Sequence, residues 1–227
     1  MAKGADGLAI SDGIMYLRGD FAHMLPRLRP GNLQRELLVR AAKVKGVKAP
    51  LAIDATAGLG EDSLLLAAAG FTVLLYERNP VIAALLEDAL ERARLVPELA
   101  DAACRMTVVE ADSVDGLSTL ARMLADQAQK STGIAVSEGP HRPDVVLLDP
   151  MFPQKQTSSS VKKKLQLLQR LERPCDNESA LLDAALSVSP RKVVVKRPVK
   201  GPYLAGRKPD YSLAGKAVRY DCIVLAR

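Results

Sequence analysis

The sequence predicts an α/β protein built on a mostly parallel sheet. Short apolar runs alternate along the chain with longer segments of helical periodicity, and four of these runs lead directly into acidic residues. The first run is followed by a glycine-rich turn, residues 54–62, that opens into a helical segment. Strand, glycine turn and helix in series are typical of the units from which parallel sheets are assembled.

The individual elements follow from apolar runs and helix-start signals. Residues 1–48 form a small extension, with a hairpin signal at 12–13 between runs 8–10 and 14–17 and a helix at 33–44. Residues 49–227 form the main domain. Its strands are expected at 51–53, 72–76, 106–110, 144–148 and 192–196. Its helices are expected at 62–69, 80–95, 115–129, 160–172 and 178–187.

The glycine turn is the strongest local signal. Gly58 and Gly60 lack a Cβ, so the backbone can adopt dihedral angles that other residues avoid, and a ligand can approach it closely. The helix that follows offers N–H groups without partners inside the helix. The turn, which begins at Asp54, therefore predicts a cofactor site. The alternative is a tight turn that uses glycine for structural reasons alone.

The second strand runs into Glu77 and Arg78. An acidic side chain at this place can accept hydrogen bonds from two ribose hydroxyls, which predicts a nucleoside cofactor. A dinucleotide is disfavoured, because its fingerprint has a third glycine or alanine where this chain has Ser63, and because Glu61 and Asp62 would repel a pyrophosphate. S-adenosylmethionine (AdoMet) has a zwitterionic tail that suits the acidic turn.

Two further strands also lead into polar residues. The third leads to Asp112 and Ser113, which can bond an adenine ring; alternatively, the aspartate caps the following helix. The fourth delivers Asp149, Pro150 and, two residues later, Phe152. Ligands of open α/β sheets bind at the carboxyl ends of the strands, so these side chains are expected at one site.

Residues 149–152 resemble the [Asn/Asp/Ser]-Pro-Pro-aromatic motif of class I methyltransferases that act on amino nitrogens of bases. Together with DATAGLG at 54–60, ERNP at 77–80 and VVVKRP at 193–198, they make the chain similar to the RsmJ family. That family methylates the exocyclic amine (N2) of a guanine in bacterial 16S ribosomal RNA. The resemblance extends from about residue 49 to the C-terminus. One departure is Met151, which stands where the broader motif has its second proline.

The resemblance implies a Rossmann-like class I methyltransferase sheet with an antiparallel strand near the C-terminus, at 220–225, paired near 212–216. It implies AdoMet as cofactor, S-adenosylhomocysteine as product, and 16S rRNA or the small ribosomal subunit as partner. Matched position by position, the family's AdoMet contacts fall on Glu61, Asp62, Glu77, Arg78, Asp112, Ser113 and Asp149. Asp54, Gly58 and Gly60 complete the predicted cofactor set.

Asp149, Pro150 and Phe152 are the predicted catalytic residues. The lone pair of a guanine amine is delocalised into the ring, so methyl transfer requires acceptors that orient the amine hydrogens. The Asp149 carboxylate and the Pro150 carbonyl can serve as acceptors, and Phe152 can stack on an unstacked base. The alternative is that Asp149 caps a turn and Phe152 belongs to the core.

The charge of the chain predicts a polyanionic partner. The formal net charge is +6 and the pI is about 9.3. A helical segment at 161–173 would place basic side chains opposite an apolar stripe, and a second basic group follows the fifth strand. The predicted RNA contacts are Lys155, Lys162, Lys163, Arg170, Lys196 and Arg197. The alternative for the helix is a solvated face without a ligand.

Composition restricts the remaining possibilities. Three cysteines without C-x-x-C spacing and two histidines predict no metal site and a cytoplasmic setting. No apolar run approaches the roughly 20 residues of a membrane span. We expect a monomeric rRNA methyltransferase. The alternatives are a methyltransferase for another amino group, on other RNA, DNA or a protein glutamine, and a non-catalytic AdoMet-binding ribosome assembly factor.

Overall fold

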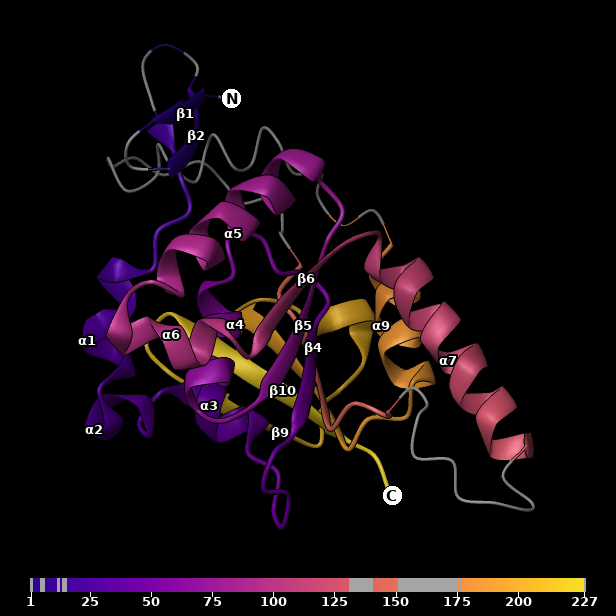
Figure 1. Cartoon of the computed structure of the whole chain (residues 1–227). Helices are drawn as coiled ribbons and strands as arrows, with labels where there is room; N and C mark the ends of the chain where they lie inside the picture. The colour runs from indigo at the N-terminus through magenta and orange to yellow at the C-terminus, as the bar shows by residue number, and fades with distance from the viewer. Residues whose placement is uncertain are drawn as a thin grey trace.

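The centre of the protein is a seven-stranded sheet, seen in a computed structural model that describes residues 2–4, 7–11, 13, 16–130, 141–150, 175 and 177–226 (Figure 1). Within these residues the sheet order is β6 (Met106–Glu110), β5 (Thr72–Glu77), β4 (Leu51–Asp54), β7 (Val145–Leu148), β8 (Lys192–Pro198), β10 (Val218–Val224) and β9 (Tyr211–Ala214). Neighbours from β6 to β8 pair in parallel, whereas β10 pairs antiparallel with β8 and β9. The predicted sheet is confirmed.

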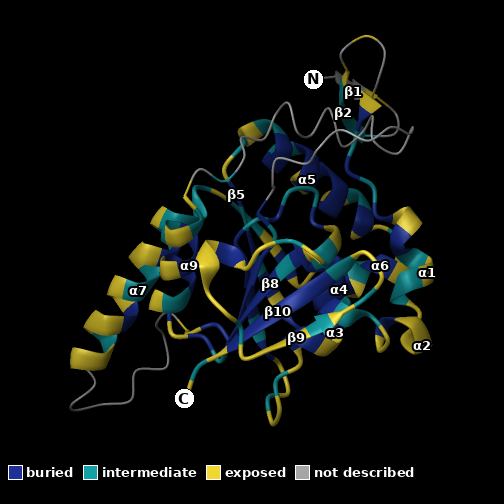
Figure 2. Ribbon diagram, turned by 180° about the vertical axis from the view of Figure 1, so that it is seen from behind, coloured by how far each residue is buried: buried dark blue, intermediate teal, exposed yellow. Residues whose placement is uncertain are grey.

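Helices cover both faces of the sheet. Figure 1 shows α3 (Leu37–Ala42), α4 (Glu61–Ala68), α5 (Pro80–Ala93) and α6 (Pro97–Ala103) on one side, with α7 (Ser113–Lys130) and α9 (Glu178–Ser187) on the other. Strand alternation places Val194 in the core of the first side and Val193 and Val195 in the core of the second. Figure 2 shows β8 and β10 buried and the outer face of α7 exposed.

Local signals explain most helix boundaries. The Asn79 side chain caps α5 by accepting hydrogen bonds from Val81 N and Ile82 N at 3.0 and 3.4 Å, with Pro80 at the first helical position as predicted. Helix α7 starts at Ser113, two residues earlier than predicted. Helix α6 was not predicted, although Pro97 at its start is a helix-start signal.

The N-terminal extension contains more elements than predicted. Strands β1 (Ala2–Gly4), β2 (Gly7–Ser11) and β3 (Tyr16–Leu17) form a small antiparallel sheet. The pairing of β2 with β3 agrees with the predicted hairpin, but Ser11 lies opposite Tyr16, so four residues separate the strands instead of the predicted two. The single helix predicted at 33–44 is confirmed only over α3 (Leu37–Ala42). The structure has three further short helices before it, η1 (Ala22–Met24), α1 (Leu25–Leu28) and α2 (Pro30–Leu33). The backbone leaves helical geometry at Glu36, where ψ is 127°.

Other predictions lie outside the described residues, among them the helix at 160–172. In the part of the chain that the structure describes, no helix is both long and apolar enough to cross a membrane.

Candidate functional site

A cavity of about 640 Å³ opens at the carboxyl ends of β4, β5, β6 and β7. It brings together every residue of the predicted cofactor set, and Pro150 with them. These lining residues are Asp54, Gly58, Gly60, Glu61, Asp62, Glu77, Arg78, Asp112, Ser113 and Asp149. Their individual roles in binding stay predictions, but the geometry that such roles require is present.

The glycine turn forms the floor of the cavity. Gly60 has a φ of +76° and occupies the N-cap position of α4. A Cβ there would lie 2.7 Å from the Leu86 Cδ1 atom, so both the backbone conformation and the packing require glycine. The adjoining Glu61 side chain lies 3.1 Å from the His23 Nε2 atom of η1, which joins the extension to the rim of the cavity.

Glu77 links the glycine turn to the start of α5. Its Oε2 atom accepts the Gly58 N–H at 3.1 Å and its Oε1 atom accepts the Asn79 N–H at 2.7 Å. Burial raises the pKa of Glu77, while these backbone hydrogen bonds oppose the rise. Each carboxylate oxygen retains acceptor capacity, so Glu77 can brace the turn and also receive a ribose hydroxyl.

Asp54 is a buried carboxylate that binds two residues of the glycine turn and its helix. Its side chain is buried and accepts hydrogen bonds from Ser63 Oγ at 2.6 Å and Thr56 N at 3.1 Å. Burial raises the pKa of Asp54 to about 7. Thr56 in turn accepts the Asp149 N–H on its hydroxyl oxygen at 2.7 Å. The Asp54 carboxylate thus connects the glycine turn with the loop after β7, and its predicted part in cofactor binding stays a prediction.

Lys196 lies between two carboxylates of the cavity. Its Nζ atom is 2.7 Å from Asp62 Oδ2 and 2.8 Å from Asp149 Oδ2. Burial lowers the pKa of Lys196, but the two carboxylates outweigh burial and raise it overall. Burial raises the pKa of Asp149, and Lys196 opposes that rise. Lys196 was predicted as an RNA contact, whereas the structure places it inside the cofactor cavity.

Arg197 points to the other face of the sheet. Its side chain has no exposed surface; its Nε donates to the Pro202 carbonyl at 2.7 Å and its Nη1 lies 3.3 Å from Glu178 Oε1. A guanidinium enclosed in this way does not reach RNA phosphate. The predicted RNA contact at Arg197 is therefore wrong, because alternation along β8 turns this residue inward against α9.

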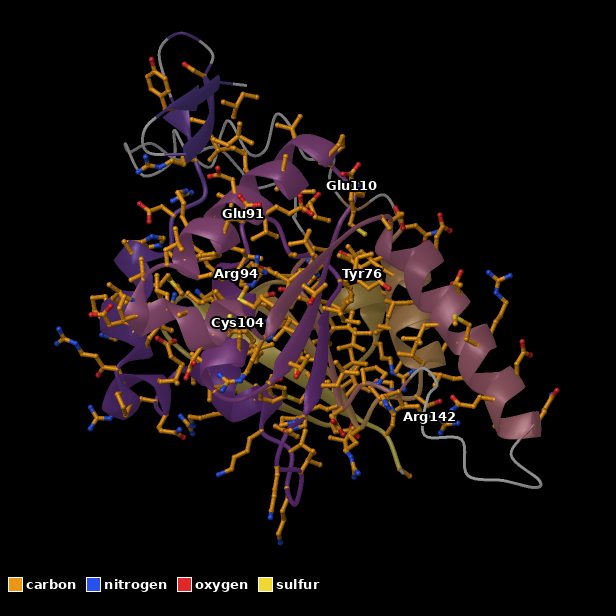
Figure 3. All side chains as sticks on the ribbon, viewed as in Figure 1. Tyr76, Glu91, Arg94, Cys104, Glu110 and Arg142 are labelled. Atoms are coloured by element: carbon orange, nitrogen blue, oxygen red, sulfur yellow. The ribbon has the colours of Figure 1, made fainter. Side chains whose placement is uncertain are left out.

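The cavity also has an apolar wall. Tyr76 projects from β5 towards α7 (Figure 3), and a Cβ at Gly116 of α7 would overlap its ring. Leu59 and Val114 lie on the same cavity. Asp112 Oδ1 caps α7 by accepting the Val114 N–H at 2.8 Å, so the capping alternative is confirmed. Its other oxygen is 4.0 Å from Arg78 Nη1.

Acidic side chains dominate the charge of the cavity. Its described lining has seven carboxylates and two cationic side chains, Arg78 and Lys196. The carboxylates are those of Asp54, Glu61, Asp62, Glu77, Asp112, Asp115 and Asp149. This field repels phosphate and favours a ligand with positive charge. Among the described residues, no group of His, Cys, Asp and Glu side chains is arranged to hold a metal ion.

Several predicted site residues lie outside the described part of the chain. They are Phe152 of the catalytic set and the RNA contacts Lys155, Lys162, Lys163 and Arg170. Their roles stay predictions. Sequence reasoning missed Thr56 and Ser63, although both belong to the glycine turn and its helix.

Comparison with known proteins decides the family. A family model for SAM-dependent methyltransferases, SAM being AdoMet, matches residues 12–225. Ribosomal RNA small subunit methyltransferase J of Nitrosococcus oceani is 44% identical over 195 residues, which cover 86% of this chain and 70% of the relative. The chain belongs to this methyltransferase family. The corresponding protein of Pseudomonas aeruginosa is 42% identical over 206 residues, 91% of this chain and 71% of the relative.

A solved structure supports the same assignment. The SAM-dependent methyltransferase of Neisseria gonorrhoeae is similar to this chain with a TM-score of 0.66 and 31% sequence identity, over 95% of this chain and 77% of the other. The family resemblance predicted from the motifs at 54–60, 77–80, 149–152 and 193–198 is thereby confirmed.

Proposed function

We propose that the protein transfers a methyl group from AdoMet to the exocyclic amine N2 of a guanine in 16S ribosomal RNA. The relatives that share the family are named as small-subunit rRNA methyltransferases. The observation that carries the proposal is the placement of Asp149, which Thr56 and Lys196 hold in the same cavity as the glycine turn and Glu77. A ribosomal substrate implies that the reaction takes place in the cytoplasm.

The residues of the cavity fit AdoMet. A volume of about 640 Å³ falls within the usual range for small-molecule sites, roughly 300–1,000 Å³. Glu77 would accept the ribose hydroxyls, and the wall formed by Leu59, Tyr76 and Val114 would hold the adenine. The excess of carboxylates suits the sulfonium and the amino group of the cofactor, and it argues against a nucleotide with phosphates.

When bound, AdoMet supplies an electrophilic methyl group on its sulfonium. The Asp149 carboxylate accepts a hydrogen bond from the guanine amine and, with the Pro150 carbonyl, aims the nitrogen lone pair at that methyl. As the new N–C bond forms and the C–S bond breaks, positive charge develops on the amine nitrogen. Asp149 stabilises this charge and is placed to take the proton that the nitrogen must lose.

Lys196 is a positioning residue in this scheme. Asp149 sits where burial favours its protonated form, which cannot accept a hydrogen bond on the protonated oxygen. The ammonium group 2.8 Å away favours the ionised form and fixes the direction of the carboxylate. The contact to Asp62 holds Lys196 itself in place. The site is thus prepared before substrate arrives.

Methyl transfer from labelled AdoMet tests the proposal. Purified protein is incubated with 16S rRNA and, separately, with small subunits isolated from cells that lack this protein. Label is expected in the RNA of at least one substrate, and Asp149→Asn is expected to abolish nearly all of it. An active, folded protein that labels DNA or protein glutamine but neither RNA substrate would contradict the proposed substrate.

A further inference from the structure

Residues 16–50, which include most of the N-terminal extension, carry a net positive charge equal to that of the whole chain. Residues 16–50 contain eight Lys or Arg side chains and two carboxylates, a net charge of +6, and the entire chain has the same net charge. The other 192 of the 227 residues therefore sum to zero. Six of the eight cations are exposed, namely Arg29, Arg35, Arg40, Lys43, Lys45 and Lys48. Lys43, Lys45 and Lys48 precede β4, at the edge of the sheet opposite the cavity, whereas Arg29 lies between α1 and α2 and Arg35 follows α2. Exposed positive charge of this kind favours contact with nucleic acid.

The extension also forms a hollow against the sheet. This cavity of about 440 Å³ lies between α1, α2 and β10, and Arg27, Asn32, Arg35 and Tyr220 are among its lining residues. Its wall is held in place, because Glu36 accepts two hydrogen bonds from the Arg27 guanidinium at 2.8 and 2.9 Å. We call this cavity the extension groove. Among its described lining residues, the aromatic one is Tyr220 and the basic ones are Arg27 and Arg35.

The extension groove adjoins the cavity at the carboxyl ends of β4 to β7, called here the methyl-transfer cavity. Tyr220 of β10 pairs directly with Lys196 of β8, and cross-strand partners project from the same face of a sheet. Tyr220 lines the extension groove, while Lys196 lines the methyl-transfer cavity and holds Asp149. The pKa of Arg27 is raised mainly by its hydrogen bonds to Glu36 and to a lesser extent by the Asp62 carboxylate, which agrees with this closeness. The groove thus lies next to the strand whose Lys196 contacts Asp149, the residue proposed to bind the target amine.

We propose that the extension groove and the adjacent Arg29 bind phosphate groups of the RNA strand that flanks the target nucleotide. The inference rests on the proposed function, because the phosphates in question are those of the RNA substrate. When one base enters the cavity, the neighbouring nucleotides must remain outside on the protein surface. The acidic cavity repels their phosphates, whereas the extension attracts them. Such contacts position the strand without reading its sequence.

Salt dependence of RNA binding tests the inference. Arg29 and Arg35 are replaced together by Gln, which removes two exposed charges and leaves the Arg27–Glu36 pair intact. Each phosphate contact on a single strand contributes about 0.7 to the slope of log affinity against log salt. Two lost contacts lower the slope by about 1.4, so that between 50 and 200 mM salt the variant loses about 7-fold less affinity than the wild type. AdoMet affinity is expected to be unchanged.

Two matched variants separate charge from other effects. Arg122→Gln with Arg142→Gln removes the same charge elsewhere. Arg122 belongs to α7, which lies on the opposite side of the sheet from α1 and α2 (Figure 1). Arg142, labelled in Figure 3, precedes β7. This control is expected to keep the wild-type slope. Arg29→Lys with Arg35→Lys retains both charges and is expected to keep most of the slope as well.

The results also separate the inference from the proposed function. If the wild type methylates small-subunit RNA and the Arg29/Arg35 Gln variant keeps the wild-type slope, the extension groove is not an RNA surface, although the proposed function stands. An equal loss of slope in the Arg122/Arg142 control likewise overturns the inference, because it shows a general charge effect. If the wild type neither binds nor methylates this RNA, both proposals fail.

Discussion

Replacing Lys196 with Met tests the electrostatic core of the site. Methionine keeps much of the length of the lysine side chain but removes its charge. Asp149 then loses the ammonium group 2.8 Å from its Oδ2 atom and keeps the unfavourable influence of Asp62. The loss of the ammonium group therefore raises the pKa of Asp149. Because an ionised Asp149 is proposed to accept the amine hydrogen bond, activity should require a higher pH.

The size of the shift follows from the contact distance. An opposite charge within about 4–6 Å lowers the pKa of a carboxylic acid by about 1–3 units. The Asp149 side chain keeps 39% of its surface exposed, and solvent screening weakens the interaction. We therefore expect the acidic limb of the pH–rate profile to move upwards by about 1–2 units. At a fixed pH below that limb, this corresponds to about 10- to 100-fold slower transfer.

The assay is single-turnover methyl transfer to RNA as a function of pH, at saturating AdoMet. Lys196→Arg serves as the matched control, because a guanidinium restores the positive charge and should return the limb towards its wild-type position. Thermal unfolding of both variants checks that the fold is intact. A folded Lys196→Met variant whose acidic limb coincides with that of the wild type would refute the assigned role of Lys196.

Four further substitutions have definite expected outcomes. Glu77→Ala should weaken AdoMet binding by about 1–3 kcal/mol in calorimetry, the range for hydrogen bonds to a charged group. Asp149→Ala should slow single-turnover transfer at least about 10²-fold at saturating AdoMet. Thr56→Val removes the acceptor of the Asp149 N–H and should slow transfer about 5-fold, which corresponds to about 1 kcal/mol, with AdoMet affinity unchanged. Burial raises the pKa of Asp54 from 3.8 to about 7, so the folded state holds an extra proton between these values. As the pH rises through that window, the free energy of unfolding should therefore fall by roughly 1.4 kcal/mol per pH unit. Asp54→Asn should remove this slope in denaturant titrations.

Each of these outcomes can fail separately. Unchanged AdoMet affinity in folded Glu77→Ala refutes the ribose assignment, and near-normal transfer by Asp149→Ala removes that residue from catalysis. A Thr56→Val variant that loses AdoMet affinity instead of rate would place Thr56 in cofactor binding. A pH slope of stability that survives in Asp54→Asn would assign the buried proton to another group.

The parallel sheet was predictable because its signals are local. Buried strands are continuous aliphatic runs, and the turn at 58–60 and the cap at Asn79 mark helix starts within a few residues. The extension was not predictable in this way. Its helix is interrupted where Glu36 turns away to bind Arg27, a residue nine positions earlier in the chain, and no periodicity reports such a contact.

The composition of the cavity was predictable, whereas its internal connections were not. Acidic strand ends identified residues that line the cavity because parallel strands end at a common edge. The contact of Lys196 with Asp149 requires β7 and β8 to be neighbours, and its contact with Asp62 requires α4 to lie over that face. Alternation along β8 nevertheless carried a usable signal. It places Lys196 on the face of Val194 and turns Arg197 towards α9, which separates two residues that charge alone had grouped together.

The central claim is that the Asp149 carboxylate binds the N2 amine of a guanine and orients it for methyl transfer. It is tested most directly with an RNA substrate in which inosine, which lacks this amine, replaces the mapped target guanosine. With labelled AdoMet and the wild-type protein, we predict methylation of the guanosine RNA at N2, identified by mass spectrometry of its nucleosides, and no methylation of the inosine RNA. Equal methylation of the two RNAs at that nucleotide would contradict the account.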